Sequence, residues 1–356
     1  MVPFFVMDFV FLLFGFLAMY FMYRGCCRQF AANGVFKLNM LPFLYIYGLF
    51  ILAAVAAGFL TDNHDFVEDI TWWRIVMPLA GAAFIYLGYL FFNDRLFMAI
   101  TASVVILTVY IQPLGNGRPF TILSEWELRL LISVLAVVYC LGNRILNLLP
   151  HIFIVPQIMV LLGLVILSLI GAVPVYVGIC AAMLAGTLGA YLALNYYKLQ
   201  IEFDDGACVG VSYLTLNLLL LNMGEYSFPS CVILTTIFWA ELLVALWNKY
   251  ILRQERTLAE CTNYYLGAEK YNVNVLVNSM VKINIVILFL SWFQLFSVNQ
   301  YSLMIIALAL AVWLNGTVGS RLGGVRSLKQ INKDFMQDLK QNITDAKNAL
   351  SRKGKK

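Results

Sequence analysis

Long apolar segments recur along almost the whole chain, and they restrict its possible fold more than any other feature. A stretch of about 17–25 mostly apolar residues can cross the hydrocarbon core of a bilayer as a helix. We identify eleven such segments. They lie near residues 3–23, 40–60, 74–92, 96–112, 128–148, 152–171, 174–195, 207–222, 229–248, 280–297 and 300–317. The sequence therefore predicts an all-α polytopic membrane protein, an eleven-span helical bundle.

The overall composition supports this class. Hydrophobic residues make up 62% of the chain and charged residues only 12%, whereas soluble domains carry about 25% charged residues. This excludes an ordinary soluble globular protein. The first segment has no basic residue before it and is followed by Arg24, so we expect a true span rather than a cleaved signal peptide.

Basic residues are distributed asymmetrically between the predicted loops. Loops on the cytoplasmic side of a membrane carry an excess of Lys and Arg. With the C-terminus in the cytoplasm, only Arg74, Arg118 and Arg129 of the 24 basic residues fall outside, and the outer loop 61–72 is acidic. Because eleven spans place the two ends on opposite sides, this predicts an N-terminus outside.

The C-terminal tail forms a separate region. We expect a transmembrane domain over 1–320 and a cytoplasmic basic amphipathic tail over 321–356. Apolar residues recur there at steps of three and four, as on one face of a helix. They are Leu328, Ile331, Phe335, Leu339, Ile343, Ala346 and Leu350. Lysines on the other face favour a helix lying on anionic headgroups, with a partner helix as the alternative.

Residues 195–208 carry the clearest candidate for chemistry. The loop after the seventh span holds the carboxylates Glu202, Asp204 and Asp205, and a small-residue step opens the next apolar segment. Mg²⁺ takes one or two carboxylates and leaves its other positions to water and substrate phosphate. The stretch is therefore either a magnesium-diphosphate site or a solvated acidic loop that caps a helix.

Other polar residues are expected at the same cytoplasmic end. Asn93-Asp94-Arg95 close the third span, while Asn143, Arg144 and Asn147 end the fifth. Glu241 lies inside the ninth span, where an acid usually faces the bundle interior or a wet cavity. The topology thus predicts one cytoplasmic pocket lined by Asp94, Asn147, Asn195, Asp205 and Glu241.

The order of these residues resembles the polyprenyl-phosphate N-acetylhexosamine-1-phosphate transferases. That family includes the enzyme that makes lipid I and those that initiate O-antigen and enterobacterial common antigen. Its members contain an Asn followed, after nine residues, by Asp-x-Gly-Ser, whose Asp binds Mg²⁺. Here Asn195 precedes Asp205 by the same interval. The family's Asp-Asp pair after the third span is similar to Asn93-Asp94, and its intramembrane acid in the ninth span to Glu241.

Two further motifs of the family align with this sequence in the same order along the chain. The family's Asn-x-x-Asn-x-x-Asp-Gly run resembles the stretch from Arg144 to His151, and its His-x-His-His motif falls on 261–264. The resemblance covers about residues 1–320. It implies a bacterial inner membrane, a cytoplasmic active site and Mg²⁺ as cofactor. The implied roles are metal binding by Asp205 and Asp204, catalysis by Asp94, Asn147 and Glu241, and cofactor binding by Asn195, Lys198, Arg253 and Arg256.

The departures from the family pattern are systematic. Asn93 replaces the first acid, Pro150-His151 replaces Asp-Gly, and all histidines of the late loop are absent. Charge on a transferring phosphoryl group is stabilised by Mg²⁺ and cationic donors. We therefore expect a catalytically degenerate transferase-like protein that binds a polyprenyl phosphate or another anionic lipid, or acts as a subunit in envelope polysaccharide assembly. The alternatives are an active divergent transferase, which moves a sugar-1-phosphate from a UDP-sugar to undecaprenyl phosphate, and a transporter.

Overall fold

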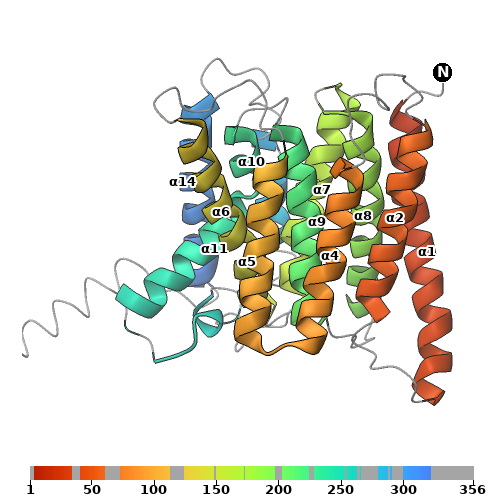
Figure 1. Ribbon diagram of the computed structural model, residues 1–356. Coiled ribbons are helices and arrows are strands. Elements are labelled where there is room, and N and C mark those ends of the chain that lie inside the picture. Colours follow the sequence, from red (N-terminus) through yellow and green to blue (C-terminus); the bar gives the residue numbers. More distant parts are fainter. Residues whose placement is uncertain are drawn as a thin grey trace, which may run out of the picture.

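The protein is an assembly of apolar helices packed side by side (Figure 1). The computed structural model describes residues 4–33, 41–60, 73–112, 124–147, 150–171, 173–196, 203–223, 228–251, 253, 255–262, 265, 280–287, 289–290 and 300–321. Its long helices are α1 (Phe4–Asn33), α2 (Leu41–Leu60), α4 (Trp73–Phe91), α5 (Asp94–Ile111), α6 (Glu125–Leu146), α7 (Pro150–Leu169), α8 (Val175–Tyr196), α9 (Asp205–Met223) and α14 (Gln300–Arg321). Shorter elements are α10 (Phe228–Leu234), α11 (Thr236–Leu246), the π-helical η2 (Trp247–Ile251) and the 3₁₀ turn η3 (Ala259–Cys261). The described residues contain no β-strand.

Helical residues occupy each of the eleven predicted segments, including 280–287 and 289–290 in the tenth. Three helices are long and apolar enough to cross a membrane by length and composition: Asp94–Ile111, Glu125–Ile145 and Val175–Leu194. Six more described helices contain shorter apolar stretches. The all-helical membrane class is thus confirmed, while the count of eleven spans and the orientation stay predictions. The predicted tail helix lies outside the described residues.

Helix α8 is deeply buried between α1, α2, α7 and α9. Its apolar window is 83% buried, against 28% for that of α5. Small residues allow this burial, because α1 crosses α8 at glycines. A Cβ on Gly186 would lie 2.1 Å from the Leu12 carbonyl oxygen, and one on Gly15 would lie 2.6 Å from the Met183 carbonyl oxygen. The two backbones are therefore nearly in contact.

The predicted ninth span is broken in two. Thr235, between α10 and α11, bonds back to the Cys231 carbonyl at 2.8 Å, and Thr236 bonds to the Val232 carbonyl at 2.8 Å. Such back-bonding by Thr bends helices. Beyond the break, α11 runs into η2 and tilts away from the bundle (Figure 1). The sequence pattern predicts one continuous span here and does not reveal the bend.

Polar contacts join α4, α5 and α9 inside the bundle. The Tyr213 and Thr108 hydroxyls lie 2.7 Å apart, and Gln112 donates to Asn217 at 3.2 Å. Gly81 makes the first contact possible, since a Cβ there would lie 2.1 Å from the Tyr213 hydroxyl. These bonds fix the three helices relative to one another, and their ends carry the candidate site.

Candidate functional site

The candidate site lies at the end of the bundle where α4 turns into α5, α6 ends and α9 begins. Asn93 caps α5: its side-chain oxygen accepts the Leu96 amide at 2.9 Å. Asn is among the preferred N-cap residues because its oxygen satisfies an otherwise unbonded amide. The cap starts the helix at Asp94 and places that carboxylate in the first turn. Asn93 therefore has a local structural role where the family has an acid.

Asp204 caps α9 in the same way. Its Oδ1 accepts the Ala207 amide at 2.6 Å, and its Oδ2 accepts the Tyr86 hydroxyl at 3.1 Å. Burial raises the pKa of Asp204 above its usual value, although these two donors act in the opposite direction. The alternative that this acidic stretch caps a helix is thus confirmed for Asp204, since one of its oxygens contacts α9 and the other contacts α4.

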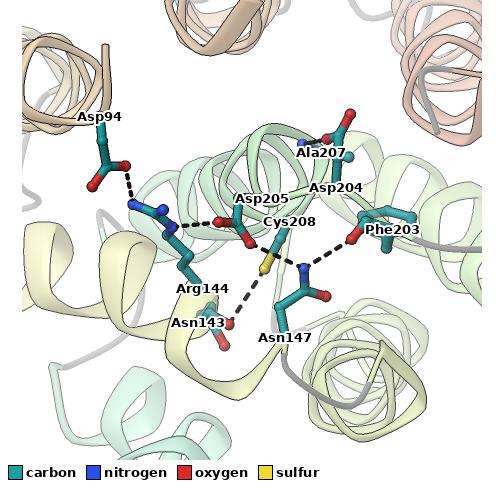
Figure 2. Close-up of polar contacts among 9 residues, drawn as sticks. All are labelled: Asp94, Asn143, Arg144, Asn147, Phe203, Asp204, Asp205, Ala207 and Cys208. Carbon is teal, nitrogen blue, oxygen red and sulfur yellow. Dashed lines mark hydrogen bonds and ion pairs between the residues drawn. The ribbon is translucent and has the colours of Figure 1, made fainter. Parts of the chain in front are cut away.

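Arg144 is the centre of the cluster (Figure 2). It lies in the last turn of α6, and its Nε donates to Asp205 Oδ2 at 2.6 Å. Its Nη1 donates to Asp94 Oδ1 at 2.5 Å. The Arg144 side chain is 28% exposed, against 35% for Asp205 and 59% for Asp94. One guanidinium therefore joins the ends of α5, α6 and α9.

Asn147 completes the cluster from the C-cap of α6. Its side-chain nitrogen donates to the Phe203 carbonyl at 2.9 Å and lies 3.4 Å from Asp205 Oδ1. One turn earlier, the Asn143 carbonyl accepts the Cys208 thiol at 3.3 Å. The end of α6 thus holds the first turn of α9 through both backbone and side chain (Figure 2).

The structure brings together three of the five residues predicted to line one pocket: Asp94, Asn147 and Asp205. Glu241 is fully buried on α11, so it faces the bundle interior as expected. Its helix meets α6 next to the cluster, where a Cβ on Gly142 would lie 2.7 Å from the Phe238 ring.

The predicted cofactor-binding residues are only partly described. Asn195 belongs to α8, but its side chain lies outside the described residues, as does all of Lys198. Arg253 and Arg256 are exposed in the segment after η2. Asn248 holds that segment back by donating to the Cys261 carbonyl at 2.9 Å.

Sequence reasoning missed the part played by Arg144. It counted this residue among the cytoplasmic basic residues and, in the family motif, at the place of an Asn. The sequence did contain a signal: at the position of Arg144 a cation replaces the neutral Asn of the family motif, in a protein whose neighbouring cytoplasmic motifs carry the acids Asp94 and Asp205.

The residues present do not fit Mg²⁺ in this arrangement. Both oxygens of Asp205 face donors on α6, and both oxygens of Asp204 are engaged by Ala207 and Tyr86. A divalent ion between Asp94 and Asp205 would have to displace the guanidinium. Within the described part of the chain, no three His, Cys, Asp or Glu side chains gather to hold a metal.

The carboxylate cluster can hold three helices together and can bind a cation, and Arg144 already supplies one. Comparison with known proteins adds no family to this description, since no family model and no curated protein matches the chain.

Proposed function

We propose that this protein is a catalytically degenerate, sugar-phosphate-transferase-like membrane protein that binds a polyprenyl phosphate or a similar anionic lipid. It serves as a subunit or scaffold in the assembly of envelope polysaccharide at a bacterial inner membrane. The observation that carries the proposal is the use of Arg144: the cation nearest to the carboxylates is bonded to two of them.

Transferase chemistry needs cations that face the phosphate. Stabilisation of developing charge by fixed donors is a large catalytic contribution, and loss of one such donor costs about 10²–10³ in rate. Arg144 donates to Asp94 and Asp205, and the late-loop positions Cys261 to Tyr264 carry no cation. In the proposal, the loss of several cationic donors together leaves a site that keeps the arrangement of its helices but no longer catalyses the transfer.

Lipid binding is supported by the segment that follows α11. Trp247, Tyr250 and Ile251 on η2 are 47%, 66% and 57% exposed. Trp and Tyr are enriched where a membrane meets water. Lys249 and Arg253 lie beside them in sequence, and basic residues at this depth attract anionic headgroups. Aromatic anchors next to cations suit a lipid that has a phosphate head.

A place for the lipid tail lies between α6, α9 and the broken span. An apolar pocket there is lined by residues that include Leu135, Leu219, Val232 and Trp239. The pocket has a volume of about 50 Å³, so it would receive only a short part of an isoprenoid or acyl chain and bury the apolar surface of that part. In the proposal the phosphate stays at the basic segment and the chain packs along these helices.

One experiment separates the scaffold from the enzyme. Purified protein is incubated with undecaprenyl phosphate, Mg²⁺ and radiolabelled UDP-N-acetylglucosamine or UDP-N-acetylgalactosamine. We expect no labelled lipid product. Turnover that disappears in an Asp205→Asn variant would instead establish an active divergent transferase.

A second experiment tests the lipid itself. Native mass spectrometry compares binding of undecaprenyl phosphate with binding of undecaprenol, which lacks the phosphate. We expect the phosphate form to bind more tightly, and Arg253→Ala to weaken it about fivefold, since one basic residue near a lipid surface contributes about 1 kcal/mol. Arg24→Ala, at an exposed position of α1, is the matched control. Equal binding of both lipids would reject the lipid part of the proposal.

A further inference from the structure

We propose that the Arg144 guanidinium takes the place of a divalent cation between Asp94 and Asp205, so that the cluster is independent of metal in the native protein. The inference does not depend on the proposed lipid or on the absence of turnover. It concerns how the chain balances its own carboxylates at the end of the bundle.

The geometry is that of a bridging cation. Two nitrogens of one guanidinium contact carboxylates from two different helices, at 2.6 Å to Asp205 and 2.5 Å to Asp94. A guanidinium presents its donors in a fixed fork and stays charged at every ordinary pH. Figure 2 shows Arg144 lying between Asp94 and Asp205. It joins the same kind of oxygen ligands that Mg²⁺ or Mn²⁺ would join.

A cation between Asp94 and Asp205 is electrostatically favourable. Two carboxylates brought toward one point disfavour each other's charged form unless an opposite charge separates them. The packing of α5 and α9 against α6 brings Asp94 and Asp205 to the two sides of Arg144. The positive charge that a metal ion would supply between two carboxylates is therefore supplied here by the Arg144 side chain.

Two buried side-chain oxygens lie near Arg144 on the same end of α6. The side-chain oxygens of Asn143 and Asn147 are buried, and neither has a hydrogen-bond partner among the described residues. Both lie on the same end of α6, and the Asn147 nitrogen is held by the Phe203 carbonyl. Removing the guanidinium would leave the carboxylates of Asp94 and Asp205, and a rotation of the Asn147 amide, whose nitrogen now faces Asp205, would turn its oxygen toward them. Carboxylate and carbonyl oxygens suit Mg²⁺ and Mn²⁺.

The test is whether removal of Arg144 creates a metal site. Mn²⁺ is titrated into detergent-solubilised protein, and the electron paramagnetic resonance signal of free Mn²⁺ is followed. We expect Arg144→Ala to bind one Mn²⁺ per chain at least about tenfold more tightly than the wild type, because a unit positive charge has been removed from the site. Mg²⁺ should displace it, and Arg144→Ala combined with Asp205→Asn should lose it.

Arg95→Ala is the matched control. Arg95 is exposed in the first turn of α5 next to Asp94, so its removal changes the net charge equally without opening the place between the carboxylates. It should bind Mn²⁺ as weakly as the wild type. If Arg144→Ala does not elute as a folded monodisperse species, Arg144→Gln replaces it, since a neutral Gln keeps a donor at this position.

Two results would overturn the inference. One is stoichiometric Mn²⁺ binding by the wild type that depends on Asp205. The other is a folded Arg144→Ala or Arg144→Gln variant that binds no more Mn²⁺ than Arg95→Ala. Neither result involves turnover or lipid, so each is distinguishable from a failure of the proposed function.

Discussion

The close crossing of α1 and α8 gives a sharp stability prediction for Gly186→Ala. A Cβ at this position would lie 2.1 Å from the Leu12 carbonyl oxygen and 3.0 Å from the Phe16 amide nitrogen. Both atoms belong to the backbone of α1, so no change of side-chain rotamer can relieve the contact. The added methyl group must push the two helices apart along their whole interface.

The magnitude follows from two opposing contributions. Ala is favoured over Gly inside a helix by about 1 kcal/mol. Overpacking a closely packed site costs about 1–3 kcal/mol, and the backbone contact places this site at the upper end. We expect Gly186→Ala to be about 1–2 kcal/mol less stable than the wild type. Gly189→Ala is the matched control, one turn along α8, because its Cβ meets only Phe16 Cδ2 at 3.8 Å. That variant keeps the gain of about 1 kcal/mol in helix propensity.

Unfolding in detergent micelles measures the difference. Thermal melts of the two variants, followed by intrinsic fluorescence and by loss of the monodisperse peak, should place Gly189→Ala at or above the wild type and Gly186→Ala clearly below it. If Gly186→Ala melts together with Gly189→Ala, α1 does not cross α8 at this glycine. The description of the α1–α8 interface would then be wrong.

Two further predictions concern buried acids. Because burial raises the pKa of Asp204 above 3.8, the native protein holds this proton at pH values where the unfolded chain has lost it. The contribution of Asp204 to stability is therefore present at low pH and is lost as the pH rises through the raised pKa. In melts between about pH 4 and about pH 7, the wild type should lose stability relative to Asp204→Asn as the pH rises. A difference that stays constant with pH would contradict the prediction. Asp8 on α1 is buried, and its carboxyl group lies beside Ser168, whose contact leaves its hydrogen bonding incomplete. Removing an incompletely satisfied buried group recovers about 1–3 kcal/mol, so Asp8→Ala should raise the melting temperature, and a lower one would show that the carboxyl group has a structural role.

Helix positions were the part of the fold that could be predicted from the sequence. Apolar runs of membrane length must satisfy their backbone hydrogen bonds internally, and a helix does this without reference to its neighbours. For this reason helices occupy all the predicted segments. The break at Thr235 depends on a local competition between Thr hydroxyls and backbone amides. A hydropathy pattern does not record that competition, since Thr is common in continuous spans as well.

The candidate site, too, could be predicted only in part. That Asp94, Asn147 and Asp205 meet follows from topology, because the ends of consecutive helices alternate between two sides. What each one bonds to does not follow, since it depends on rotation of the helices about their axes. Arg144 bridges two acids because α6 presents that side of its last turn to α5 and α9. Asp204, one residue from Asp205, turns instead to its own helix and to Tyr86.

The position of η2 at the exposed end of the tilted α11 has a consequence for how this segment sits in a membrane. The hydrogen-bonded helices α4, α5 and α9 cannot easily change their tilt, whereas η2 leaves the bundle with Trp247 and Tyr250 exposed (Figure 1). Helices respond to a mismatch between their apolar length and the bilayer by tilting, at a cost of fractions of a kcal/mol per Å. A thinner or thicker bilayer should therefore move η2 first, with the bend at the end of α11, because α11 itself is buried against its neighbours. Membrane thickness would then set the height of the segment that carries Arg253 and Arg256, and with it the depth of these two cations in the headgroup region.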